Sequence, residues 1–288
     1  MIEALESLSS NKVRSGLTML GIIIGVGAVI AMMSIGSGAQ ASITNQINTI
    51  GVNLLYVISG GDARTPQPLT LEDAKAIADP QRAPAVARVA PVLQGQVEIS
   101  VAGEDANTTL YGITPEFFQV QTAEIAEGQT ITQAQVDSSA PVVLLGSDTA
   151  DDLFNGTTGL VGKTVRIEGQ VFKVIGVLKA QGGSGFGNAD QRVLTPLSTA
   201  QLRLLRRSSP GQVDMLYVQA TSSDTVQAAN DDVTQILRAR HTKTLGVDDF
   251  DIMSTQSILE MASAITGTMT AFLGGIAGIS LLVGGIGI

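Results

Sequence analysis

The sequence has no cysteine, no tryptophan and a single histidine, His241, among 288 residues. Without cysteine the chain cannot form disulfides, use a thiolate nucleophile or bind a metal through sulfur. Without tryptophan it lacks one of the side chains that anchor proteins at the membrane–water interface. Because proteins without disulfides occur on either side of a bacterial membrane, the missing cysteines leave the cellular compartment open.

Charged side chains are missing from two long segments. No Asp, Glu, Lys or Arg occurs within residues 15–61 or within residues 261–288. Each segment contains a continuous apolar run, at 17–35 and at 271–288, close to the ~20 residues that cross the ~30 Å hydrocarbon layer as a helix. We therefore predict two transmembrane helices.

The predicted membrane helices, at 15–36 and 266–288, enclose residues 37–265, for which we predict an α+β domain with helical stalks. Lys12 and Arg14 lie just before the first helix, and basic residues beside a membrane helix stay in the cytoplasm. The large domain is therefore expected on the extracytoplasmic side.

Residues 1–14 carry apolar side chains at helical spacing, which predicts a short amphipathic helix on the cytoplasmic side. A solvated helix without membrane contact fits the same pattern. A cleaved signal peptide is an alternative interpretation of the first apolar run, with residues 36–39 at the cleavage site. It is disfavoured because the apolar cores of signal peptides are ~7–15 residues long.

The formal net charge of −9 lies on residues 62–260, because the two acidic and two basic residues before position 15 cancel. An acidic domain repels the phosphates of nucleic acids and anionic lipids, so neither is expected as a partner. A domain of about 200 residues is large enough to bury a sizeable core.

Small residues four positions apart occur in both predicted membrane helices, as Gly21 and Gly25 in the first and Gly274 and Gly278 in the second. This spacing lets two helix backbones approach closely. The four glycines are therefore candidate helix-packing residues, although glycine is also common in membrane helices without this role.

The middle region alternates strands and helices without a regular β–α–β repeat, which indicates an α+β fold. Thr70 and Asp73 have the spacing of a capping box at a helix start, and Gly169 marks the turn of a hairpin. The predicted strands are 54–58, 86–94, 96–101, 108–113, 142–145, 164–168, 171–180, 215–220 and 250–253. The predicted helices are 71–78, 115–118, 148–154, 198–206, 225–240 and a helix from 256 onward.

Gly162, Lys163 and Thr164 resemble the end of a phosphate-binding loop, but Thr157 stands where that motif needs its first glycine. A predicted strand follows instead of a helix whose N-terminus could hold phosphate. Nucleotide binding is therefore not expected here. The glycine-rich residues 181–188 are predicted to form a loop, with partner contact as the alternative.

His241 is predicted to lie on the surface near a helix end, where it can help cap the last carbonyls. No partner motif supports a catalytic triad or a metal site around it. Asp248, Asp249 and Asp251 do not match a calcium-binding loop and are predicted to form a solvated acidic turn. The sequence thus predicts no catalytic, cofactor-binding or metal-binding residue.

Two terminal blocks and four internal ones are similar to a known family. They read ALESLSSNKVRSGLTMLGIIIGVGAVIAMMSIGSGAQ and AGISLLVGGIGI at the ends, and NLLYVISGG, KTVRIEGQVFKVIGVL, RVLTPLSTAQ and VDDFDIMS between them. Together they resemble the MacB/FtsX-like permeases of ABC transporters. The resemblance implies a bacterial inner-membrane protein whose extracytoplasmic (periplasmic core) domain has two α+β lobes.

The resemblance also implies the partners. ATP and Mg²⁺ would be bound by an ABC ATPase, expected as a separate chain, while this chain would be non-catalytic and bind no cofactor. A second permease copy, identical or paralogous, the lipid bilayer and a membrane fusion or adaptor protein are further implied partners. Such permeases continue past the second membrane helix, so the sequence is expected to be the N-terminal portion of a longer permease.

The resemblance implies that ATP hydrolysis moves the membrane helices and that the stalks carry this movement to the outer domain for export. The alternative is a membrane-anchored binding or sensor domain without an ATPase. A membrane-anchored hydrolase is disfavoured because no nucleophile or metal constellation occurs.

Replacing Gly21 and Gly25 by leucine in the complete transporter is predicted to weaken helix association or ATPase-coupled activity, because the bulky side chains keep the backbones apart. Cross-linking in membranes and cargo transport measure the two effects. Unchanged assembly together with unchanged activity would reduce the first apolar segment to a simple anchor.

Overall fold

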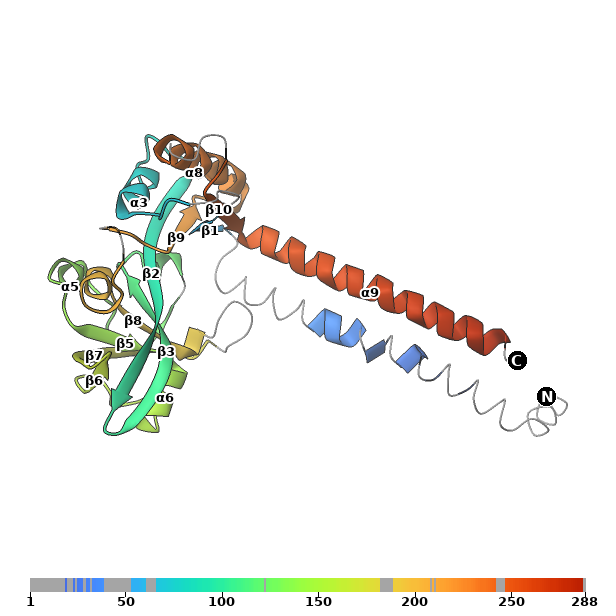
Figure 1. Ribbon diagram of the computed structural model, residues 1–288, viewed down its shortest axis with the longest axis horizontal. Helices are drawn as coiled ribbons and strands as arrows, with labels where there is room; N and C mark the ends of the chain where they lie inside the picture. Colours follow the sequence, from blue (N-terminus) through green and yellow to red (C-terminus); the bar gives the residue numbers. More distant parts are fainter. Residues whose placement is uncertain are drawn as a thin grey trace. The chain divides into compact units, whose positions relative to one another are not determined.

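The computed structural model describes residues 53–286 except 61–65, 122, 182–188, 208, 210 and 242–246, together with parts of 19–38. The chain divides into two compact units (Figure 1). One consists of residues 47–255, and the other of residues 1–46 and 256–288. The second unit contains almost all of α9 (Thr255–Ile286), a helix of 32 residues. Among the residues described, no helix is both long and apolar enough to cross a membrane.

The larger unit is built on a single ten-stranded sheet. Its strands are β1 (Leu54–Ser59), β2 (Val86–Val101), β3 (Glu104–Ile113), β4 (Ile125–Gly128), β5 (Val142–Leu145), β6 (Thr164–Ile167), β7 (Gln170–Leu178), β8 (Arg192–Pro196), β9 (Met215–Ala220) and β10 (Phe250–Ser254). The strand order is β10-β1-β9-β2-β3-β8-β5-β7-β4, and β6 pairs with both β2 and β7.

Six of these strands close on themselves. The antiparallel pair β2–β3 continues through β8, β5 and β7 to β6, which pairs back onto β2. Strand β4 pairs with β7 and lies at the end of the strand order. The strands β10, β1 and β9 extend the sheet from the other half of β2 as an open, antiparallel layer.

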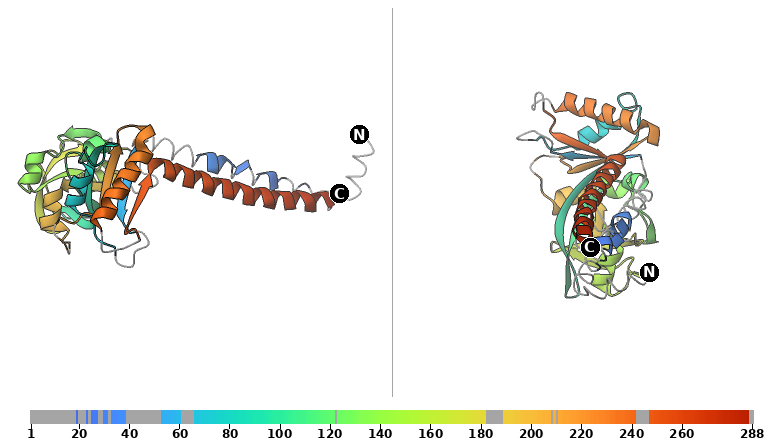
Figure 2. Two further views of the ribbon diagram at one scale, coloured as in Figure 1. Left: turned by 90° about the horizontal axis from the view of Figure 1, so that it is seen from above. Right: turned by 90° about the vertical axis from the view of Figure 1, so that its right-hand side faces the viewer.

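The helices gather at two places on the sheet. They are α3 (Leu71–Ile77), α4 (Phe117–Val120), α5 (Gln133–Asp137), α6 (Ser147–Phe154), α7 (Leu197–Thr199) and α8 (Val226–Arg240), with 3₁₀ turns at Ala189–Gln191 and Ser223–Thr225. Helices α3 and α8 pack side by side against the open layer, whereas α5, α6 and α7 pack around the closed part (Figures 1 and 2). Together with the sheet they form two regions joined by β2, and the predicted α+β composition is confirmed.

Local sequence explains why helix α3 begins where it does. Thr70 caps α3 because its hydroxyl accepts a hydrogen bond from the Asp73 N–H, while the Asp73 carboxylate accepts from the Thr70 N–H. The predicted capping box is therefore confirmed. Helix α8 buries Ala229, Val233 and Leu237 on one face, the spacing that amphipathic helices use.

The structure differs from the predicted elements in several places. Residues 86–94 and 96–101 form one continuous strand, because Gly95, where the prediction separated them, pairs with Leu110 of β3 and continues the ladder. The predicted helix 198–206 is instead α7 followed by a π-helix at Ala200–Leu204. Strands β4 and β8 and helix α5 were not predicted.

Gly112 is a packing constraint on β3, since a Cβ atom there would lie 2.5 Å from the Ala200 Cβ. We predict that Gly112→Ala lowers the free energy of unfolding by about 1–3 kcal/mol, measured by chemical denaturation. Adding Ala200→Gly should recover part of this loss through a favourable coupling in a double-mutant cycle. Gly156→Ala, where the new Cβ meets nothing within 4 Å, is the control, and equal losses at both glycines would refute the constraint.

Candidate functional site

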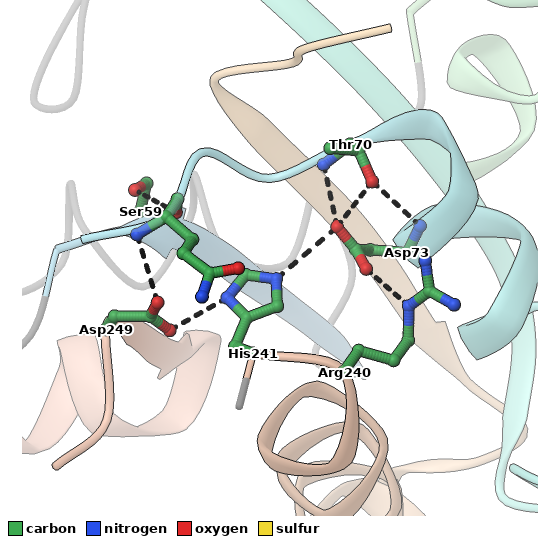
Figure 3. A network of polar contacts seen from close by, with 7 residues as sticks. Ser59, Thr70, Asp73, Arg240, His241 and Asp249 are labelled. Atoms are coloured by element: carbon green, nitrogen blue, oxygen red, sulfur yellow. Dashed lines mark hydrogen bonds and ion pairs between the residues drawn. The ribbon is translucent and has the colours of Figure 1, made fainter. Parts of the chain in front are cut away.

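A buried polar network joins α3, the end of α8 and the segment that leads into β10 (Figure 3). At its centre His241, the residue that ends α8, is only 6% exposed. Its ring lies between two carboxylates that are still less exposed, Asp73 at 2% and Asp249 at 0%. Ionisable groups are rarely buried to this extent unless they are paired, so the arrangement is a specific one.

Asp73 is held by several donors. The Thr70 N–H and hydroxyl both donate to its Oδ2 atom, at 2.9 and 2.6 Å. The Arg240 guanidinium donates through Nε to its Oδ1 atom at 2.5 Å. His241 Nε2 lies 3.4 Å from Oδ2, so the end of α8 is tied to the beginning of α3.

Asp249 connects the same imidazole to the other side of the network. Its Oδ1 atom lies 2.8 Å from His241 Nδ1, and its Oδ2 accepts a hydrogen bond from the Gln67 N–H at 3.0 Å. The Gln67 carbonyl in turn accepts from the Ser59 hydroxyl at 3.0 Å, and the Asp249 carbonyl accepts from the Gly60 N–H at 2.9 Å. The end of β1, the segment around Gln67 and the start of β10 are thus joined.

Among the described residues, the charges of the network balance when the imidazole is protonated, with two carboxylates facing one guanidinium and one imidazolium. Burial raises the pKa of Asp73, but hydrogen bonds from His241, Thr70 and Arg240 outweigh it and hold that pKa well below its usual range. The hydrogen bond to Asp73 raises the pKa of His241 against the opposing effect of burial, and Asp249 raises it further. Each partner therefore favours the charged form of the other.

A polar pocket of about 640 Å³ adjoins the network. It is lined by Ser59, Pro66, Pro68, Gln94, Arg207, Ser209, Gln212, Val213 and Asp214. Across its wall, Arg207 Nη2 donates to the Gln94 carbonyl at 2.7 Å and to Asp214 Oδ2 at 2.6 Å. Because Ser59 and the two prolines lie on the segments that the network holds, the pocket and the network share a wall.

The two hydroxyls of the network are hydrogen-bonded to groups other than the imidazole. The Ser59 hydroxyl donates to the Gln67 carbonyl and the Thr70 hydroxyl to Asp73, so neither donates to the imidazole in the contacts described above. No group of three potential metal ligands occurs in the described part of the chain. What the network can do is hold three segments together and change its strength with protonation.

Two sequence predictions about these residues are wrong. His241 does end a helix, and its N–H donates to the Leu237 carbonyl at 2.7 Å, but its ring is buried and does not lie on the surface. Asp249 is fully buried and does not belong to a solvated turn, because its carboxylate is hydrogen-bonded to the buried His241 ring and to the Gln67 N–H. Asp248 and Asp251 are half-buried to exposed, and Asp248 accepts two hydrogen bonds from Arg238 at 2.7 Å.

No local sequence pattern identifies this network, because His241 and Asp73 are separated by 168 residues. The capping box of Thr70 and Asp73 indicated only that the Asp73 side chain lies at the start of a helix. The predicted strand that begins at Thr164 is confirmed as β6. Of the glycine-rich residues 181–188, all but the first lie outside the described part.

The structure describes only some of the candidate helix-packing glycines. Gly25 lies in a described helical stretch and is buried, while Gly274 and Gly278 are on α9, where an added Cβ would meet nothing within 4 Å. Gly21 and the topology-setting Lys12 and Arg14 lie outside the described residues. The packing role therefore stays a prediction.

Comparison with protein families identifies the fold. Residues 15–236 match the model of the MacB-like periplasmic core domain. The chain is 37% identical, over 98% of its length, to the macrolide export ATP-binding/permease protein MacB of Rhodospirillum rubrum, and covers 43% of that protein. It is 31% identical, over its full length, to the pyoverdine export ATP-binding/permease protein PvdT of Pseudomonas entomophila, of which it covers 44%. The chain thus spans less than half the length of these curated relatives.

Two crystal structures have a similar fold. The periplasmic region of MacB from Actinobacillus actinomycetemcomitans superposes with a TM-score of 0.62 at 24% identity, over 77% of this chain and 98% of that one. The extracellular domain of the transporter YknZ, from Gram-positive bacteria, gives 0.58 at 21% identity, over 70% and 100%.

Asp73→Asn is predicted to lower the free energy of unfolding by about 3 kcal/mol, because it removes the partner of a buried charged pair. The unfolded-state pKa of an aspartate is ~3.9, and the folded-state value of Asp73 is lower. Its stabilisation is therefore complete above pH ~4 and is lost as the pH falls through the folded-state value. Denaturation curves at several pH values should show a shallower acid limb in the variant.

The matched control for that experiment is Asp248→Asn, which removes the carboxylate of the more exposed pair with Arg238 and should cost at most ~1 kcal/mol. Equal effects of the two substitutions would show that the buried pair does not stabilise the fold.

Proposed function

Because the chain belongs to the family of MacB-like periplasmic core domains, we propose that it forms the extracytoplasmic part of an ABC-type export permease and transmits movement, without itself catalysing a reaction. The domain then stands outside the bacterial inner membrane. The names of the relatives pair ATP binding with a permease, which supports coupling to an ATPase. We propose that this ATPase, as a domain of the same protein or as a separate subunit, binds the ATP and Mg²⁺.

The pairing of β1 with β10 supports the mechanical part of the proposal. The strands at which the chain enters and leaves the larger unit, β1 and β10, are antiparallel neighbours, with Leu55 opposite Ser254. The Thr255 hydroxyl donates to the Leu54 carbonyl at 2.9 Å. A displacement of either connecting segment therefore acts on one pair of hydrogen-bonded strands, from which it passes into the rest of the sheet.

We further propose that residues 15–36 and 266–288 cross the membrane. Three features support this proposal: both segments lack charged side chains, both are long enough to span the bilayer, and two basic residues precede the first segment. In this arrangement ATP-driven closure of the ATPase rearranges the membrane helices of two permease copies, and the connecting segments move the outer domains. An adaptor protein is a further proposed partner outside the membrane.

The cargo is not fixed by this proposal. The relatives' names mention macrolides and pyoverdine, and we propose export of a cargo without assigning either compound to this chain. The second candidate function is a membrane-anchored binding or sensor domain, which the pocket of about 640 Å³ favours. The two candidates differ in whether the outer domain must be rigidly connected to moving helices.

We consider the complete transporter reconstituted in liposomes, with four glycine and serine residues inserted between Ser254 and Thr255. This insertion is predicted to abolish cargo export while ATP hydrolysis continues, because a flexible segment does not transmit force. The same insertion between Ala102 and Gly103, at the β2–β3 turn, is the control and should leave export intact.

Export that survives the insertion at Ser254 would refute mechanical transmission. ATP hydrolysis that never depends on the permease chain would favour the sensor instead. Circular dichroism on both variants checks that the outer domain stays folded.

A further inference from the structure

We propose that His241 is a proton-operated latch, which fastens α3 to the segment leading into β10 when its imidazole is protonated and releases that joint when it is neutral. The geometry that points to this is the position of the ring, with Nδ1 2.8 Å from an Asp249 oxygen and Nε2 3.4 Å from an Asp73 oxygen. A carboxylate accepts hydrogen bonds and cannot donate them. Only an imidazolium has an N–H on both sides to satisfy both carboxylates.

A neutral imidazole must turn a lone pair toward one of the two carboxylates. The contact to Asp73 is the longer one, and Asp73 keeps three other donor contacts, from the N–H and hydroxyl of Thr70 and from Arg240. Asp249 has, besides the imidazole, the Gln67 N–H on its side chain. The tautomer that keeps its proton on Nδ1 is therefore favoured, and the joint that opens is the one between His241 and α3.

The charged groups around the ring determine the direction of the effect. Helix α3 presents Asp73, whereas its neighbour Glu72 pairs with Lys75 on the exposed side. Helix α8 presents Arg240, and its Arg238 is turned to Asp248. The segment before β10 presents Asp249, and the ring packs edge-to-face on Phe250. Within the part of the chain that the structure describes, loss of the imidazole proton thus leaves two buried carboxylates against one guanidinium.

This environment raises the pKa of His241 above its ordinary value, with the hydrogen bond to Asp73 as the largest cause. A group with a raised folded-state pKa contributes full stability below its unfolded-state pKa, ~6.5 for histidine, and loses that contribution as the pH rises through the folded-state value. The latch is therefore closed in acid and opens toward alkaline pH.

The latch acts on two functional parts at once. Helix α3 directly follows the segment that contains Pro66 and Pro68, which line the pocket. Asp249 directly precedes β10, which leads into α9. Closing the joint between His241 and Asp73 therefore connects the pocket wall to the segment proposed to carry movement. This physiological consequence rests on the proposed function, because only a domain outside the inner membrane meets the external pH.

The test uses the fact that His241 is the only histidine of the chain. In the whole chain in detergent, labelled with ¹⁵N-histidine, NMR should give a titration midpoint above 6.5 and a neutral form protonated on Nδ1. Asp73→Asn should lower the midpoint by about one pH unit, as expected for the loss of an adjacent opposite charge. Asp248→Asn should leave it unchanged.

Hydrogen exchange measured by mass spectrometry reports the opening itself. After correction for the intrinsic pH dependence, exchange within residues 71–77 and 66–70 should rise about fivefold above the midpoint, as for the loss of one hydrogen bond. His241→Gln, which cannot titrate in this range, should remove the step. If that variant does not fold, the wild-type chain and Asp73→Asn still give the comparison.

A midpoint at or below 6.5, or the same midpoint in Asp73→Asn, would overturn the latch. So would exchange that is equal in the two protonation states. None of these measurements depends on ATP or cargo, so a failed latch and a failed transport function are distinguished.

Discussion

Strand β2 is the element on which the rest of the larger unit depends. Its first half pairs with β9 over Val86–Val92, and its second half pairs with β3 over Val92–Val101 and with β6. Each half belongs to a different region, one an open layer and the other a closed ring of strands. Because backbone hydrogen bonds run continuously along β2, the two regions cannot hinge freely about a linker, and a force applied to one reaches the other.

The entry and exit strands depend on β2 through one intermediate. Strand β1 lies between β9 and β10, and β9 pairs with the first half of β2. The polar network completes this layer on the helical side, since it ties α3 and α8 to the segments that flank β1 and β10. Apolar packing alone would allow these surfaces to slide, whereas charged hydrogen bonds in a buried site have fixed directions and partners.

The chain belongs to the family of MacB-like periplasmic core domains. Its one imidazole lies between the carboxylates of Asp73 and Asp249, beside the segment that leads into β10. The buried imidazole adds a dependence on protons to a connection that is otherwise fixed by the backbone.

The amino-acid sequence by itself determined the elements whose cause is local. Alternating apolar residues predicted β6 and β7, and short apolar segments predicted β1, β5 and β9. Thr70 and Asp73 predicted the start of α3, and the terminal and internal blocks predicted the family. Tertiary structure alone decided that β2 runs unbroken through Gly95, since this glycine pairs with Leu110 of β3 and leaves room for the Leu205 side chain, whereas a glycine within a strand pattern by itself indicates an interruption. It also decided that His241 and Asp249, which were predicted to face solvent, are buried. Their burial depends on a carboxylate 168 positions away from His241, and contacts at that separation leave no periodicity in the sequence.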